Sequence, residues 1–223
     1  MNALDYIDHS IPFLKTTDSV IKGLGWMEEY KILNLAVVEA KTKQYLGLVS
    51  EIVLLNEGGN DLLTQDMLLH SQELYVKSND HIYEALRVIS KTELDVCAVV
   101  DSDGRFLGTL TANMLLNCMN EFTSATDHGG VIELLMYSYE YSLVEISRAV
   151  ESNGARVLSS YVSSVKGEGD KVKVVIKLNV TDVSLVITEF QQLNYTVTGI
   201  YSDFEAPDDI SDNYRHLFKY LNL

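Results

Sequence analysis

A short apolar run, a polar turn and a second apolar run stand together in Ala98-Val99-Val100-Asp101-Ser102-Asp103-Gly104-Arg105-Phe106-Leu107-Gly108-Thr109-Leu110-Thr111. The Asp-Gly pair in this stretch is a strong signal for a hairpin between two strands. The same pattern occurs earlier in the chain, where Ala36-Val37-Val38-Glu39 is followed by a turn and Tyr45-Leu46-Gly47-Leu48-Val49-Ser50. The stretch therefore belongs to an internal repeat.

The repeat extends toward the N-terminus of both stretches. An offset of 62 residues aligns residues 14–20 with residues 76–82. We expect Asp18 and Asp80 to be helix N-caps, because a carboxylate there accepts hydrogen bonds from free backbone amides. Apolar residues at helical spacing follow each cap and predict one buried stripe per helix: Val20, Leu24 and Met27 in the first copy, and Ile82, Leu86 and Ile89 in the second.

Each copy ends in a hydroxyl residue that is expected to cap a closing helix. Ser50 precedes the helical segment 51–55, and Thr111 precedes the segment 112–119. The predicted unit is therefore βαββα, with repeat 1 in residues 1–62 and repeat 2 in residues 63–122. One such unit cannot bury both faces of its sheet, so we expect the two copies to pack together.

At these residues the sequence resembles the CBS domain family, and specifically the tandem CBS pair or Bateman module. The resemblance implies a cleft between the repeats that binds an adenine nucleotide or S-adenosylmethionine. It implies that the hydroxyls of Ser50 and Thr111 lie near phosphate at a helix N-terminus. It also implies that six further residues line the entries to the two sites: Thr16, Thr17 and Asp18, and Ser78, Asn79 and Asp80.

The chain departs from the family pattern at two positions. Nucleotide binders of this family usually carry an Asp three residues after the Ser or Thr, where this chain has Val53 and Met114. Bases that could meet phosphates are few: Lys15, Lys77, Arg87 and Arg105. Two interpretations remain open, namely a ligand site with weakened nucleotide contacts, and hydroxyls that only cap helices.

The second half of the chain begins after a polar linker, residues 123–130. Residues 131–203 predict the order βαββαβ, a ferredoxin-like sandwich. Within it, residues 171–180 alternate between apolar and polar side chains, which is typical of a strand with one wet face. We expect Asp182 to cap the second helix, whose apolar positions are Val183, Val186, Ile187, Phe190 and Leu193. The overall prediction is an α+β protein.

This half is similar to the ACT domain family, on the residues Leu143-Val144-Glu145-Ile146-Ser147 and Asn153-Gly154-Ala155-Arg156-Val157. Amino-acid-binding ACT domains carry an Asp-Arg-Pro-Gly-like loop, where this chain has Tyr139-Glu140-Tyr141-Ser142. The tyrosines here indicate core or interface packing. Residues 204–223 predict an amphipathic C-terminal helix. The whole arrangement resembles acetoin-utilisation regulatory proteins of the AcuB type.

Charge and composition exclude several classes of function. The 223 residues carry a net charge of -15, and both halves are acidic, so we expect no nucleic acid or anionic membrane as a partner. The five histidines are scattered and no cysteine has ligand spacing, so we expect no metal. The N-terminus lacks a basic start and an apolar secretion run, which predicts a cytoplasmic protein with buried, reduced cysteines.

We find no catalytic motif, and an enzyme is the weakest of three hypotheses. The first is a regulatory sensor, a homodimer through the CBS pair, the ACT-like domain or both, that takes an adenosyl ligand and controls an unidentified partner protein. The alternative is a ligand-free oligomerisation or interaction module with degenerate clefts. Clefts poor in Lys and Arg are expected to hold a triphosphate weakly, which favours a less charged adenosyl ligand or no ligand.

Overall fold

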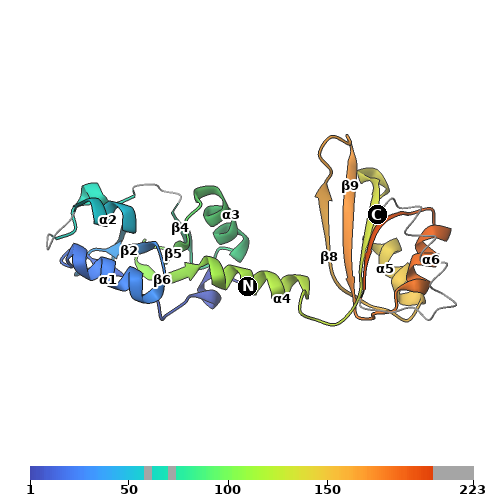
Figure 1. The fold of residues 1–223 in the computed structure, drawn as a ribbon, viewed down its shortest axis with the longest axis horizontal. Coiled ribbons are helices and arrows are strands. Elements are labelled where there is room, and N and C mark those ends of the chain that lie inside the picture. Colours follow the sequence, from blue (N-terminus) through green and yellow to red (C-terminus); the bar gives the residue numbers. More distant parts are fainter. Residues whose placement is uncertain (58–61, 70–73, 203–223) are drawn as a thin grey trace. The chain divides into compact units, whose positions relative to one another are not determined.

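The computed structural model describes residues 1–57, 62–69 and 74–202. The chain divides into two compact units, Met1–Cys118 and Met119–Leu223 (Figure 1). The predicted C-terminal helix lies outside the described residues. In the described part of the chain, no helix combines the length and the apolar character that crossing a membrane requires.

The first unit contains two copies of the same element order, as predicted from the repeat. The first copy consists of β1 (Leu14–Lys15), α1 (Val20–Tyr30), β2 (Asn34–Val38), β3 (Tyr45–Ser50) and α2 (Glu51–Glu57). The second consists of β4 (Tyr75–Lys77), α3 (Ile82–Thr92), β5 (Val96–Val100), β6 (Phe106–Thr111) and α4 (Ala112–Thr123), whose last turns enter the second unit. Each copy has a three-stranded sheet with one parallel and one antiparallel pair.

The predicted caps of the first helices are wrong by one residue. Ser19 caps α1 by accepting a hydrogen bond from the amide of Lys22, and His81 occupies the same position before α3. The carboxylates of Asp18 and Asp80 instead turn back and accept hydrogen bonds from the amides of Lys15 and Lys77 in the loop before the helix. An aspartate two residues before a helix can satisfy its own turn, and the following residue then takes the cap.

The buried face of α3 is rotated relative to the predicted stripe. Ile82, Ala85 and Val88 are buried, whereas Leu86 and Ile89 are only half-buried. Periodicity alone predicts that the larger side chains lie inside, whereas the structure buries the small Ala85 in their place. In α1, Val20 and Met27 are buried as predicted and Leu24 is half-buried.

The segment before each repeat pairs with the other repeat. The amides of Ala3 and Asp8 donate to the carbonyls of Asp80 and Thr109, at 2.9 and 2.8 Å. Residues 62–69 make the two equivalent bonds to the first repeat. Residues 1–8, which precede the first repeat, therefore complete the second repeat, and residues 62–69, which precede the second repeat, complete the first. This exchange joins the two copies in one folding unit.

The hairpin turns of the two repeats also join. The amide of Tyr45 donates to the carbonyl of Gly104 at 3.0 Å, and that of Phe106 donates to the carbonyl of Lys43 at 2.9 Å. The Tyr45 and Phe106 rings stack with centroids 6.5 Å apart, and further rings pack against this pair: Phe13 against Phe106, and Tyr75 against Tyr45. This end of the repeat pair is therefore closed by aromatic packing.

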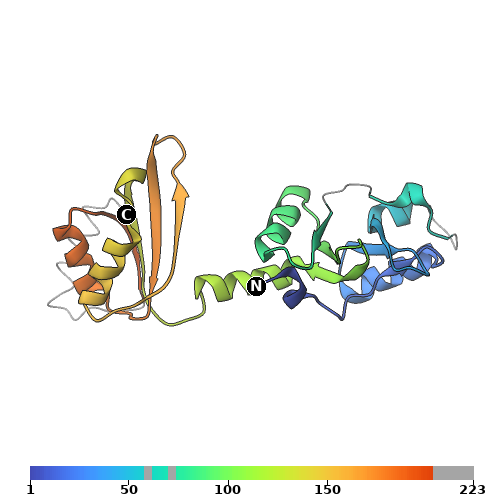
Figure 2. The ribbon, with the colours of Figure 1, turned by 180° about the vertical axis from the view of Figure 1, so that it is seen from behind.

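The second unit has the predicted order βαββαβ. Its elements are β7 (Val131–Tyr137), α5 (Leu143–Ser152), β8 (Val157–Ser164), β9 (Lys171–Leu178), α6 (Ser184–Gln192) and β10 (Thr196–Tyr201). The antiparallel sheet has the strand order β10-β7-β9-β8, and both helices cover the same face of it (Figure 2). Alternate residues of β9, among them Val174 and Ile176, are fully buried beneath the helices, as the alternation predicts.

Two details of this unit differ from the prediction. Val183 holds the cap position of α6, and the Asp182 carboxylate accepts a hydrogen bond from the amide of Ser184 at 3.0 Å. Leu193, predicted to face the core, is exposed because α6 ends at Gln192 and the chain turns there.

Candidate functional site

The eight predicted site residues lie at opposite ends of the strands. The amides of Thr16 and Ser78 donate to the carbonyls of Val38 and Val100, so these loops lie at the C-terminal ends of β2 and β5. In contrast, Ser50 is in register with Asn34, at the start of β2. Four residue steps along a strand span about 13 Å. Within one repeat the structure therefore separates Thr16, Thr17 and Asp18 from Ser50, and likewise Ser78, Asn79 and Asp80 from Thr111.

The aspartates of the two loops are engaged in local structure. The Asp18 carboxylate accepts from the Lys15 amide at 2.9 Å and pairs with Lys22 Nζ at 2.7 Å. Burial raises the pKa of Asp18, but the bonds from Lys22 and Lys15 outweigh it and hold the pKa below its ordinary value. Asp80 accepts from the Lys77 amide at 2.8 Å. These carboxylates therefore stabilise their loops.

Ser50 and Thr111 cap the closing helices, as predicted. Ser50 Oγ accepts from the amide of Val53 at 3.4 Å, and Thr111 Oγ1 accepts from that of Met114 at 3.1 Å. A hydroxyl that accepts from a helix amide still has its own hydrogen to donate. Both residues can therefore cap a helix and contact a ligand at the same time.

A network centred on Asp95 connects the two repeats at this end. Asp95 Oδ2 accepts from the amide of Leu33 at 2.5 Å, and Oδ1 accepts from Asn34 Nδ2 at 2.7 Å. The Leu33 carbonyl accepts from the amide of Glu51, and the Asp95 carbonyl accepts from that of Ala112, both at 2.8 Å. The Asp95 network, these five residues, therefore links the first residues of α2 and α4.

Asn34 leaves one acceptor of this network unused. The side chain is buried, with 5% of its surface exposed, and its Oδ1 has no hydrogen-bond partner among the described residues. A buried acceptor without a donor is costly and rare in native proteins. Because Asn34 is in register with Ser50 and bonded to Asp95, this acceptor lies beside the residues that the resemblance implies for ligand binding.

Sequence reasoning missed Asp95 and Asn34. The one available signal was the alignment itself, in which the acidic Asp95 stands opposite the apolar Leu33. A charged side chain at a position that is apolar in the other repeat indicates a residue whose role is set by tertiary contacts.

Among the described residues, the Asp95 network includes no Lys or Arg that could neutralise phosphates, although Lys31 lines the groove that Leu33 and Glu51 also line. Arg87 pairs with Glu84 at 2.8 Å, and Arg105 lies 3.5 Å from Asp103. Lys15 and Lys77 lie in β1 and β4, which pair with the C-terminal half of β2 and with β5. The charged groups of the Asp95 network are the carboxylates of Asp95 and Glu51. Its electrostatics therefore disfavour a polyphosphate.

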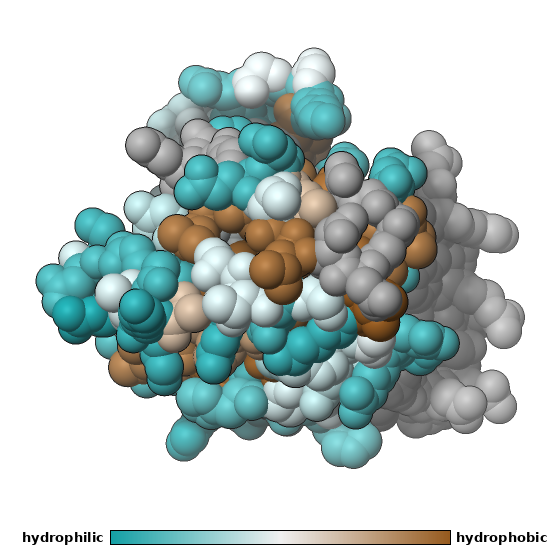
Figure 3. Space-filling view, turned by 90° about the vertical axis from the view of Figure 1, so that its left-hand side faces the viewer, coloured by the Kyte–Doolittle hydropathy of each residue, from teal (hydrophilic) through white to brown (hydrophobic). Residues whose placement is uncertain are grey.

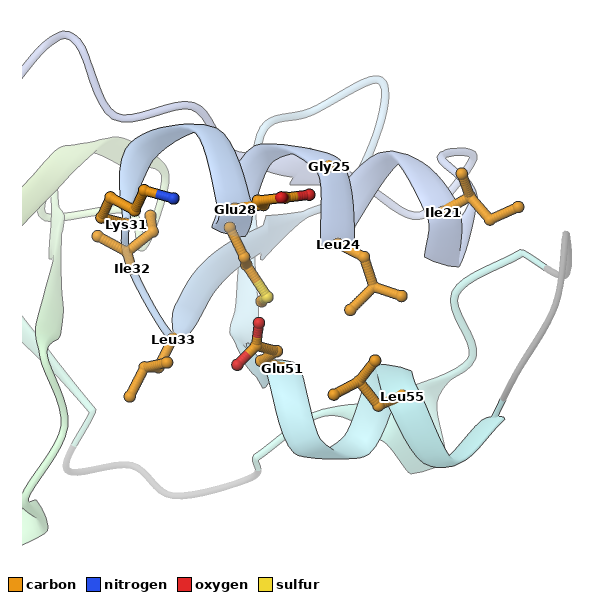
Figure 4. Close-up of a pocket in the computed structure, with 10 residues that line it drawn as sticks. Ile21, Leu24, Gly25, Glu28, Lys31, Ile32, Leu33, Glu51 and Leu55 are labelled. Carbon is orange, nitrogen blue, oxygen red and sulfur yellow. The ribbon is translucent and has the colours of Figure 1, made fainter.

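A second candidate site is an apolar groove between α1 and α2, which lie side by side. In the space-filling view, apolar surface gathers at this end of the first unit within a polar surround (Figure 3). Leu24 of α1 and Leu55 of α2 point toward each other across the groove (Figure 4). Leu55 is 60% exposed and Leu33, at one end of the groove, is 57% exposed. Contiguous exposed apolar residues are typical of a protein interface.

The described residues hold no group of three His, Cys, Asp or Glu side chains that could bind a metal ion. Both cysteines are buried, and neither forms a disulfide.

A family model, the CBS domain, matches residues 65–121. Together with the first repeat, this match supports a CBS domain pair. The chain is also similar to a CBS domain pair/ACT domain protein from Thermotoga maritima, with 19% identity over 54% of this chain and 98% of that one, at a TM-score of 0.49.

Two further solved structures show similarity of the same order. The CBS domains of a transcriptional regulator from Streptococcus pneumoniae are 16% identical over 52% of this chain and 98% of that one, at a TM-score of 0.47. A structure of CBSX2 in complex with AMP is 21% identical over 53% of this chain and 95% of that one, at a TM-score of 0.44. None of these similarities assigns a ligand to this chain.

Proposed function

We propose that this chain is a non-catalytic regulatory protein whose repeat pair takes an adenosyl ligand at the Asp95 network and controls a partner protein. The observation that carries the proposal is Asn34 Oδ1, a buried acceptor that receives no hydrogen bond from the described residues and belongs to the residue in register with Ser50. An adenosyl group supplies donors of the required kind, the exocyclic amine and the ribose hydroxyls. The CBS match over residues 65–121 supports the same class of function.

The negative charge of Asp95 favours adenosyl ligands that carry a positive charge over those that carry phosphates. The Asp95 carboxylate bonds to Leu33 and Asn34 and cannot leave without exposing both donors. A sulfonium such as that of S-adenosylmethionine is attracted to this carboxylate, whereas the phosphates of ATP are repelled. We therefore expect S-adenosylmethionine to bind more tightly than AMP, and AMP more tightly than ADP or ATP.

The test is thermal unfolding with each of these four compounds at millimolar concentration. Binding to the folded state alone raises stability by about 2.7 kcal/mol at a hundredfold excess over Kd. Thr111→Ala is expected to lower the free energy of unfolding by about 1 kcal/mol, because a helix cap is lost. It is also expected to reduce the rise in unfolding temperature that the ligand causes. Ser142→Ala removes a comparable cap from α5, where Ser142 Oγ accepts from the Glu145 amide, and is expected to keep the response. If none of the four compounds raises the unfolding temperature, the ligand proposal fails.

A second candidate function is a ligand-free interaction module, and the groove between α1 and α2 favours it. We propose that a second copy of the chain covers this groove to form a homodimer. Glu28, Lys31 and Glu51 border the apolar floor, so the rim carries charges of both signs, as a self-complementary interface requires. This proposal does not depend on any ligand.

Light scattering at micromolar concentration tests the dimer. Leu55→Glu places a charge in the apolar floor and is expected to shift the protein to a monomer. Leu185→Glu, at a 66% exposed position on α6, makes the same change outside the groove and is expected to leave the dimer intact. A monomeric wild-type protein would contradict this proposal without affecting the ligand test.

A further inference from the structure

The second unit contains a cavity of about 490 Å³ that neither proposal uses. It lies between the end of β7, the start of α5 and the turn from α6 to β10. Its walls combine three tyrosines and two glutamates with mostly uncharged neighbours. The residues that the argument uses are Tyr139, Glu140, Tyr141, Glu145, Asn194 and Tyr195.

The aromatic walls are held in place by the core and by the turn. Asn194 adopts the left-handed conformation with φ 61°, which reverses the chain after α6 and directs it into β10. The Tyr195 ring meets Phe190 edge-on at 5.8 Å, and Phe190 is fully buried. Tyr141 packs against the same core. Two of the three rings are therefore fixed before any ligand arrives.

The two carboxylates act on the same part of the cavity. Glu145 Oε2 accepts from the hydroxyl of Tyr195 at 3.1 Å, and Glu140 Oε2 accepts from the amide of Tyr137 at 3.1 Å. Burial, the bond to Glu145 and the charges of Glu145 and Glu140 together raise the pKa of Tyr195. Both carboxylates therefore lie near the Tyr195 hydroxyl.

Among the described residues that line the cavity, no positive side chain compensates this charge; Lys171 Nζ lies 5.9 Å from the Tyr137 ring but pairs with Glu168 at 3.0 Å. The lining contains neither Lys nor Arg. Among the described residues, the second oxygen of each glutamate accepts no hydrogen bond. The N-terminus of α5 contributes roughly half a positive charge at this end, which two carboxylates outweigh.

We propose that this cavity binds a small organic cation of the alkylammonium class. Carboxylates supply the charge for such a ligand, and tyrosine faces attract an ammonium group while contacting its alkyl carbons. A free amino acid fits less well, because its carboxylate would meet Glu140 and Glu145 with no base to receive it. The proposal does not rest on the adenosyl site, which lies in the first unit.

Isothermal titration of the full chain with choline tests the proposal. We expect binding in the millimolar range, because the site is open to solvent. The uncharged analogue 3,3-dimethyl-1-butanol has the same shape and is expected not to bind. Equal affinity for the two compounds, or tighter binding of glycine than of choline, would overturn the proposal.

Matched variants locate the site. Glu145→Gln is expected to weaken choline binding about tenfold, the effect of losing roughly one close charge contact. Glu151→Gln makes the same charge change on the same helix outside the cavity and is expected to bind choline as the wild type does. Tyr195→Phe keeps the aromatic ring and removes only the hydroxyl. Its circular dichroism spectrum is expected to match that of the wild type, which would show that the packing is retained. If Glu145→Gln and Glu151→Gln bind choline equally, the site is not this cavity.

Discussion

Thr109 places a hydroxyl where the equivalent residue of the first repeat, Leu48, has an apolar side chain. Thr109 is 1% exposed, and its Oγ1 has no partner among the described residues. Burying a hydroxyl without a hydrogen bond costs about 1–3 kcal/mol. The residue therefore carries a penalty that an isosteric apolar side chain removes.

We predict that Thr109→Val raises the free energy of unfolding by about 1 kcal/mol, measured by urea denaturation. Thr123→Val is the control, because the Thr123 hydroxyl donates to the carbonyl of Met119 at 2.7 Å and is already satisfied. A gain of equal size in both variants would contradict the explanation.

Cys97 is a buried thiol in the strand β5. Burial raises its pKa from 9.0 to about 12. Because the thiolate is the reactive form, we predict that Ellman's reagent does not label Cys97 in the folded protein at pH 8. The Cys118→Ala variant isolates Cys97 for this measurement, and rapid labelling without denaturant would show the prediction to be wrong.

The raised pKa of Cys97 also makes the free energy of unfolding depend on pH. Between pH 9 and pH 12 the unfolded thiol loses its proton while the folded thiol keeps it, so the unfolded state is favoured. The contribution of Cys97 is present in full below pH 9 and decreases as the pH rises toward 12.

At the scale of elements, the N-terminal segment and β6 meet at a glycine. A Cβ atom at Gly108 would lie 2.2 Å from Ile7 Cγ2, and Ile7 belongs to the segment that completes the second repeat. We predict that Gly108→Ala displaces this segment and destabilises the first unit by about 1–3 kcal/mol. Thermal unfolding measures the loss.

Gly25, in contrast to Gly108, lies where an added side chain has room. It lies inside α1, and a Cβ atom there would meet nothing within 4 Å. Gly25→Ala is therefore expected to stabilise by about 0.5–1 kcal/mol, since glycine is the weaker helix former. Loss of stability in both variants would show that the fit at Gly108 is not the cause.

At the scale of the whole molecule, the two units have separate cores. One buried cluster comes from both repeats, with residues such as Leu35 and Val96, and the other comes from the second sheet and its helices. Cores that share no buried residues are expected to unfold in separate transitions.

Calorimetry of Phe190→Ala tests this expectation. Phe190 is fully buried in the second core, and its truncation costs about 3–5 kcal/mol. We predict that one calorimetric transition moves to lower temperature and the other stays in place. A single transition that shifts as a whole would contradict independent cores.

Much of the fold was predictable because local pattern and tertiary structure agree. The alternation predicted for residues 171–180 and the caps Ser50 and Thr111 are properties of short segments. The strand β9 forms over Lys171–Leu178, and both caps are present. The candidate site was less predictable. Ser50 and Asp18 are separated by the direction in which β2 and β3 run, which residue types do not reveal.

The sequence by itself determined the elements and their duplication, since periodicity, turn residues and the offset of 62 residues are local or directly comparable features. Only the tertiary structure decided which groups meet. It brought Asp95 to Leu33 and Asn34, and it paired residues 1–8 with the second repeat in place of the first. Contacts between distant segments depend on how the sheets pack, and packing is a property of the whole core, not of any one stretch of chain.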